Sequence, residues 1–143
     1  IAVNVKGVFL GNKYVLPKMN DGGSVILTAS VAGIAGSPNV TAYIASKHAV
    51  VGMMKNLAIE VAPRKIRVNT INPSPVDNRM MRSLEAGYNP DDAIGMKKAF
   101  ENSIPLGRYA DPIEIAQLVQ FLASDESKFI TGTTQVIDGG MNA

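Results

Sequence analysis

The stretch from Ser24 to Asn56, SVILTASVAGIAGSPNVTAYIASKHAVVGMMKN, decides the fold. It begins with an apolar run over residues 24–29, which is typical of a short strand buried on both faces. After a turn of small residues, the pattern over residues 41–62 predicts a long helix, and Pro63 ends it. A strand followed by a covering helix is the unit from which parallel α/β sheets are built.

The same alternation continues on both sides of this stretch. Residues 1–19 carry apolar side chains at helical spacing, and apolar runs over residues 66–71 and 133–137 predict two further strands. Asn89 and Asp111 each precede a proline and an acidic residue, a pattern typical of helix starts. The sequence therefore predicts an α/β fold with a parallel sheet.

The composition predicts one globular domain and argues against several functions. Hydrophobic residues make up 46% and charged residues 18%, which is enough for a packed core and too apolar for disorder. The net charge of +2 is spread along the chain, so we expect no nucleic-acid partner. No apolar run is long enough to span a membrane. The chain has no cysteine, which excludes disulfides and is compatible with a reducing, cytoplasmic location.

Three side chains in the opening stretch suggest proton-transfer chemistry. Tyr43 and Lys47 lie four residues apart and therefore share one helix face. A tyrosine has an ordinary pKa of about 10, and a neighbouring ammonium in a partly dry cleft favours its phenolate. Ser30 follows the first strand, at the edge of the sheet where ligands bind in open α/β folds. Together these groups could exchange a proton with an alcohol or a carbonyl.

Two other hypotheses use the same residues. A tyrosine and a lysine at this spacing also occur as a half-buried phenol beside a solvated ammonium, with no chemistry attached. A hydrolase could use Ser30 with the single histidine, His48. The sequence argues against the hydrolase, because it has no G-x-S-x-G motif and His48 lies next to Lys47, on a different helix face.

Several motifs at separated places along the chain add to this pattern. Each combines small or polar residues with a predicted element: Asn4-Val5-Lys6-Gly7, Thr28-Ala29-Ser30 with Gly33, Tyr43-x-x-x-Lys47, Ile66-Arg67-Val68-Asn69, Asn72-Pro73, Ile104 to Arg108, and Asp138-Gly139-Gly140. In this order they resemble the short-chain dehydrogenase/reductase family over essentially all 143 residues. The resemblance implies a partial Rossmann-type, doubly wound parallel sheet, formed by the last three strands of the family fold and their helices.

The resemblance also implies roles for individual residues. The chain would interconvert a secondary alcohol and a ketone with NAD or NADP as cofactor. Tyr43 would be the general acid/base, and Lys47 would assist it. Both would contact the nicotinamide ribose, and Ser30 would hold the substrate oxygen. Asn4 would lie in a helix kink and position a water in a proton relay; as an alternative, its amide would only bond backbone.

The segment after the second predicted strand departs from the family pattern. The resemblance implies that Pro73, Ser74, Val76 and Asn78 contact the nicotinamide. Ser74 stands where the family has glycine, which matters if the backbone there needs a positive φ. Asn78 stands where the family has threonine and can still donate a hydrogen bond. Residues 79–108 would form a segment that covers the substrate.

One family feature is absent from these residues. No G-x-G-x-x-G or G-x-x-x-G-x-G motif, which would hold the cofactor pyrophosphate, occurs in the sequence. We therefore expect residues 1–143 to be the C-terminal part of a single Rossmann-type dehydrogenase domain, which binds cofactor weakly when isolated. The resemblance also implies a homo-oligomer, a dimer or a tetramer. A non-catalytic chain that acts only through oligomerisation is the alternative function.

Overall fold

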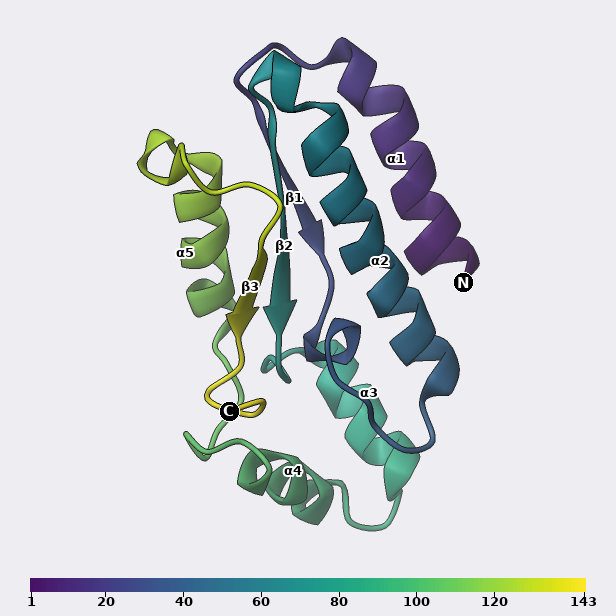
Figure 1. The fold of residues 1–143 in the computed structure, drawn as a ribbon. Helices are drawn as coiled ribbons and strands as arrows, with labels where there is room; N and C mark the ends of the chain where they lie inside the picture. Colours follow the sequence, from purple (N-terminus) through teal and green to yellow (C-terminus); the bar gives the residue numbers. More distant parts are fainter.

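A three-stranded parallel sheet forms the centre of the computed structural model, which describes all 143 residues. Its strands lie in the order β1 (Ser24–Thr28), β2 (Arg67–Pro73) and β3 (Thr134–Ile137). Helices α1 (Val8–Val15) and α2 (Thr41–Glu60) lie on one side of the sheet, and α5 (Pro112–Ala123) lies on the other (Figure 1). This layered arrangement confirms the predicted fold class and leaves one edge of β1 without a strand partner.

The core lies between α2 and the sheet. Val50, Met54 and Ala58 are buried on one face of α2 and pack in a single cluster with Val68 of β2. Burial of such side chains stabilises the fold by roughly 1.5–3 kcal/mol each relative to exposure. This apolar face is therefore the contact that holds α2 against the strands.

The first helix is less regular than the sequence predicts. Residues Ala2–Gly7 form a π-helical turn before α1, and Leu16–Lys18 form a 3-10 turn after it. A π turn holds more residues than an α turn, so it rotates the following side chains away from the face expected from an α-helical period. Phe9 is 53% exposed, whereas its neighbour Val8 packs against the core cluster.

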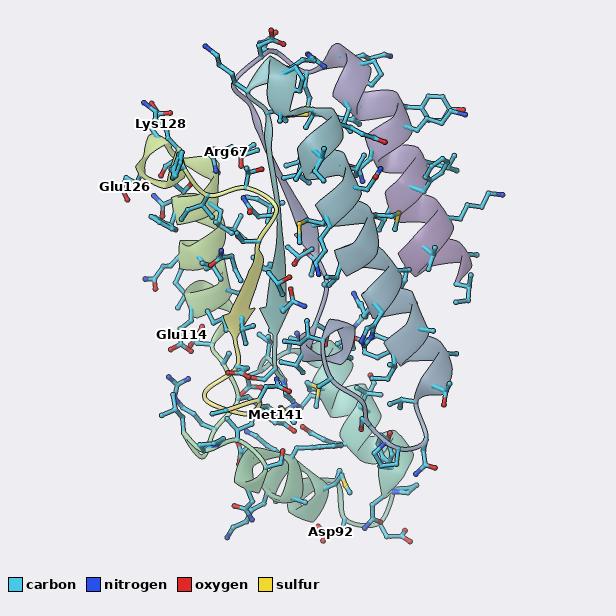
Figure 2. The ribbon with its side chains drawn as sticks, in the orientation of Figure 1. Arg67, Asp92, Glu114, Glu126, Lys128 and Met141 are labelled. Atoms are coloured by element: carbon cyan, nitrogen blue, oxygen red, sulfur yellow. The ribbon has the colours of Figure 1, made fainter.

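Strand β2 is buried along most of its length, and three of its four polar side chains, those of Arg67, Asn69 and Asn72, bond to neighbouring segments. The Arg67 guanidinium donates to the Ser127 hydroxyl at 2.9 Å and to the Ser124 carbonyl at 3.0 Å. Figure 2 shows Arg67 at the end of the sheet far from α3 and α4. A cation at the last carbonyls of α5 is favourable, so we assign Arg67 a structural role.

Asn69 connects β2 to the segment that leads into β3. Its amide donates to the Ile130 carbonyl at 2.9 Å, and its amide oxygen accepts from the Thr133 backbone N–H at 3.1 Å and hydroxyl at 2.8 Å. The side chain is fully buried. The Ile130 carbonyl and the Thr133 backbone N–H would lose their partner if the amide were removed, whereas the Thr133 hydroxyl would still accept from Gln135.

Two short helices lie beyond the carboxyl ends of the strands (Figure 1). They are α3 (Arg79–Tyr88) and α4 (Ala93–Asn102). The predicted helix start at Asn89 is wrong: Asn89 ends α3, and the Asp92 side chain caps α4 by accepting from the Gly95 N–H. The Asn89-Pro90 pair forms the turn between the two helices because a proline disfavours helical backbone at the preceding residue.

The predicted start of the last helix is confirmed. Asp111 caps α5, Pro112 occupies its first turn, and Glu114 reaches back to the Asp111 backbone N–H. Arg108 makes a two-pronged ion pair with Glu114 at 2.7–2.8 Å, and this lowers the Glu114 pKa to about 2. Figure 2 shows Glu114 at the end of α5 that is nearest α4.

No helix of this fold is both long enough and apolar enough to cross a membrane.

The bonds of Asn69 predict a large stability difference between two asparagines. Asn69→Ala should lower the free energy of unfolding by at least about 2 kcal/mol, because buried donors and acceptors lose their partners. Asn56→Ala is the matched control, since the exposed Asn56 side chain bonds only Glu60, one turn along α2. It should change stability by less than about 0.5 kcal/mol. Urea unfolding of both variants measures the difference, and equal midpoints would contradict it.

Candidate active site

The site is built where α2 comes closest to the turn that follows β1. That turn is a 3-10 turn over Val31–Gly33. A Cβ atom on Gly33 would lie 2.9 Å from the Lys47 carbonyl oxygen and 3.1 Å from a methyl group of Val51. Real Cβ atoms essentially never approach backbone this closely, so only glycine fits without movement. The glycine lets α2 lie directly on the carboxyl end of β1.

Lys47 connects this helix to the strand end. Its ammonium donates to the carbonyl oxygen of Thr28, the last residue of β1, at 3.1 Å. The same nitrogen lies 5.7 Å from the centre of the Tyr43 ring. This is within the range of a cation–π contact. The structure therefore brings Tyr43 and Lys47 together at the carboxyl edge of the sheet.

Exposure differs between these two side chains. Tyr43 is 41% exposed, so its phenol is open to a ligand. Partial burial lowers the pKa of the Lys47 ammonium, because burial disfavours the charged form. A lysine whose proton is less tightly held, next to an open phenol, is suited to a site that moves protons.

Ser30 lies at the start of the same 3-10 turn. Its hydroxyl oxygen accepts from the Ala32 backbone N–H at 3.2 Å and donates to the Pro73 carbonyl at 3.5 Å. The second contact is at the limit of hydrogen-bond length and is weak. The hydroxyl thus caps a short turn, and its donor proton is only loosely held.

Asn4 lies within the π-helical turn before α1. Its amide nitrogen donates to the Ser46 hydroxyl at 3.1 Å, and Ser46 in turn donates to the Tyr43 carbonyl at 2.7 Å. Asn4 therefore contacts the turn of α2 that carries Tyr43 and Lys47, although no hydrogen bond joins it to Lys47. The structure thus places Asn4 in an irregular helical turn that contacts α2. Its role in a proton relay stays a prediction.

The loop after β2 extends the same edge. Ser74 is buried and donates from its backbone to the Ile137 carbonyl at 3.2 Å. The φ angle of Ser74 is not positive, so serine fits here without backbone strain although the family has glycine at this position. Val76 pairs with Ala110 in a short parallel bridge. Asn78 caps α3 by accepting from the backbone N–H groups of Met80 and Met81.

A polar cluster fixes α3 and α4 below this loop. The Tyr109 hydroxyl donates to the buried Glu85 carboxylate at 2.8 Å, and Arg82 pairs with Glu85 at 3.2 Å. Arg82 also pairs with Asp77 at 2.9 Å, and Lys97 lies 3.6 Å from the same residue. Burial and Glu85 raise the pKa of Tyr109 far above its ordinary value, so this phenol stays protonated. Tyr109 is therefore a structural hydrogen-bond donor, and Tyr43 remains the candidate general acid/base.

The geometry does not support the hydrolase hypothesis, which pairs Ser30 with His48. The His48 ring bonds the Ile44 carbonyl of its own helix at 3.0 Å, and no hydrogen bond joins it to Ser30.

One residue that bonds the Ser30 backbone is not among the predicted site residues. Asn72 is fully buried in β2, and its amide donates to the Ser30 carbonyl at 2.6 Å. An amide inside the apolar run of a buried strand was the available signal, because a buried polar group needs a partner.

Comparisons with known proteins show the family to which this fold belongs. The family model described as "Enoyl-(Acyl carrier protein) reductase" matches residues 1–142. A solved short-chain dehydrogenase family protein from Francisella tularensis superposes with a TM-score of 0.93 and 38% identity, covering 96% of this chain and 58% of that one. The chain belongs to the short-chain dehydrogenase/reductase family.

Two further relatives show how much of a family member is present here. The oxidoreductase UcpA of Salmonella typhimurium is 46% identical over 98% of this chain and 54% of its own length. The crystal structure of levodione reductase has a TM-score of 0.94 and 38% identity over 98% of this chain and 55% of that chain. The chain thus spans about half the length of the relatives it matches.

The close approach at Gly33 generates a testable prediction. Gly33→Ala should destabilise the fold by about 1–3 kcal/mol, because its Cβ would overlap the backbone of α2. Gly36→Ala is the matched control, since nothing lies within 4 Å of a Cβ there. Thermal unfolding measured by circular dichroism compares the two variants. A Gly33→Ala protein that is as stable as Gly36→Ala would contradict the described packing.

Proposed function

We propose that this chain carries the proton-transfer half of an NAD(P)-dependent oxidoreductase that interconverts a secondary alcohol and a ketone. The observation that supports this most is the placement of Lys47 between the Thr28 carbonyl and the Tyr43 ring. This places an open phenol and an ammonium at the carboxyl edge of a parallel sheet, where ligands of such folds bind.

The donor set fits a nicotinamide cofactor. Lys47 offers N–H donors and Tyr43 an O–H, and ribose hydroxyls accept from such groups. The Pro73–Asn78 loop lies at the same edge, so Pro73, Ser74, Val76 and Asn78 are proposed contacts of the nicotinamide. The cofactor supplies the hydride chemistry, while the protein supplies placement and electrostatics. These residues do not distinguish NAD from NADP.

Each side chain has a separate task in this proposal. Tyr43 gives a proton to the substrate oxygen, or takes one from it, since its hydroxyl is open. The Lys47 ammonium favours the phenolate electrostatically. Ser30 turns its weakly held proton from the Pro73 carbonyl to the substrate oxygen. Asn4 supports the first turns of α2 through Ser46 and, in the proposed relay, orders a water that returns protons towards Lys47.

Residues 79–108 are the proposed substrate cover. They hold α3 and α4, which lie beyond the strand ends, and they carry exposed apolar side chains such as Met80 and Leu84. Methionine adapts to varied apolar ligands. The name levodione reductase supports a carbonyl compound as substrate, and we extend this class to the present chain as a proposal.

A homo-oligomer, either a dimer or a tetramer, is the proposed assembly. A groove between α1 and α2 is lined by Phe9, Pro17, Met53 and Leu57. Of these side chains, Phe9 is 53% exposed. Such a surface favours a protein partner. The cysteine-free composition supports the cytoplasm as the proposed compartment.

A non-catalytic chain that acts only through such contacts is the second candidate. Its support is that the 143 residues contain no glycine-rich phosphate-binding motif. Cofactor binding and turnover separate the two candidates.

Removal of the Tyr43 hydroxyl tests the proposed chemistry. In the complete gene product, Tyr43→Phe should lower turnover by at least about 100-fold, because the proton-transfer group is lost, and leave most of the cofactor affinity, because Lys47 still donates to the ribose. Lys47→Ala should weaken both. Tyr14→Phe, at an exposed tyrosine on α1, is the matched control and should keep full activity. Near-normal turnover by Tyr43→Phe would refute the assigned role.

The 143-residue chain alone gives a second test. It should bind NADH or NADPH with millimolar affinity or weaker and show no turnover. The remaining hydrogen bonds add about 0.5–1.5 kcal/mol each, and association costs at least about 4 kcal/mol. Calorimetric titration measures the affinity. Micromolar binding would contradict this estimate and would mean that the chain, or a second copy of it, holds the phosphates by other groups.

A further inference from the structure

Asn72 lies one residue before the end of β2 and is entirely closed to solvent. Its side chain projects to the α2 side of the sheet, because it alternates with Ile71 and shares a face with Val68, which packs in the α2 core cluster. The amide nitrogen would lie 3.2 Å from a Cβ on Gly33. Asn72 therefore fills the space between the strand, the 3-10 turn and α2.

The amide holds the backbone of Ser30. The Nδ2 group donates to the Ser30 carbonyl at 2.6 Å, which is short for such a bond. The next residue, Pro73, accepts the Ser30 hydroxyl through its own carbonyl at 3.5 Å. Two consecutive residues of β2 thus hold the two oxygens of Ser30, one firmly and one loosely.

This arrangement is costly for the core. The Asn72 amide oxygen is buried and has no hydrogen-bond partner. A buried acceptor without a partner costs about 1–3 kcal/mol, and an apolar side chain at this position would avoid that cost. Stability of the strand alone therefore does not explain an asparagine here, whereas the bond to Ser30 does.

We propose that Asn72 is a positioning residue for Ser30. Its amide fixes the Ser30 backbone, so that rotation of the hydroxyl alone carries the proton from the Pro73 carbonyl to a substrate oxygen. The proposal rests on the proposed function, because it matters only if Ser30 contacts a substrate. It adds a residue whose action passes entirely through Ser30.

A double-mutant cycle tests this dependence in the complete gene product. Asn72→Asp keeps the shape and replaces the donor by an acceptor, and it should lower kcat by about tenfold to 100-fold with little change in cofactor affinity. Ser30→Ala should cost more, about 100-fold to 1,000-fold. In the Ser30→Ala background, Asn72→Asp should cost less than about twofold, because residues that act as a unit are not additive.

Thr70→Val is the matched control. Thr70 is fully buried on the same face of β2, and its hydroxyl also has no partner. The change should leave kcat within about twofold. Asn72→Ala, which introduces no buried charge, replaces Asn72→Asp if that variant fails to fold, and it should show the same loss and the same non-additivity.

The outcomes separate the two hypotheses. If the wild-type protein is inactive with every alcohol and ketone tested, the result would contradict both the proposed function and the positioning role. An active wild type in which the Asn72 and Ser30 losses multiply would contradict the positioning role alone, since Asn72 would then act on stability. Loss of kcat that disappears in the Ser30→Ala background supports it.

Discussion

The close contact between α2 and the turn after β1 is the constraint on which the rest of the site depends. Gly33 allows the backbone of α2 at Lys47 to lie against this turn. Because of that contact, the Lys47 ammonium, which its own helix holds beside the Tyr43 ring, also reaches the Thr28 carbonyl. A side chain at position 33 would move the helix away from the strand end and weaken the contact between Lys47 and Thr28.

The two ends of β2 have different polar chemistry. At its start, Arg67 bonds the end of α5, and Asn69 bonds the approach to β3, so these buried polar groups hold the layers together. At its end, Asn72 and Pro73 bond Ser30, beside the residues proposed to act on substrate. The strand thus joins a structural network at one end to the candidate site at the other.

Much of this fold follows from the sequence, because its signals are local. The apolar runs predict the three strands, and Asp111 with Pro112 and Glu114 predicts the start of α5. The π-helical turn at Ala2–Gly7 could not be predicted from an apolar period, since that period assumes an α-helix throughout. Asn89 has a residue type that often caps helices, but Asp92 is the N-cap of α4, because the Asn89-Pro90 pair forms a turn.

The sequence predicts only the part of the site that depends on local spacing. The four-residue spacing of Tyr43 and Lys47 places them on one helix face, and the structure brings them together. The contact of Lys47 with the Thr28 carbonyl and that of Asn72 with Ser30 join residues far apart in the chain. Such contacts depend on how α2 and β2 pack against the turn, and this packing cannot be predicted from a local sequence pattern.

A crystal structure of the complete gene product with bound NADH or NADPH would show whether the carboxyl ends of β1 and β2 form the cofactor site. We expect the Lys47 ammonium within hydrogen-bond distance of the nicotinamide ribose. We also expect the Tyr43 hydroxyl beside the nicotinamide ring, on the same side of α2 as Ser30. A cofactor bound away from the carboxyl ends of β1 and β2, or a Tyr43 side chain turned away from the ring, would contradict this expectation.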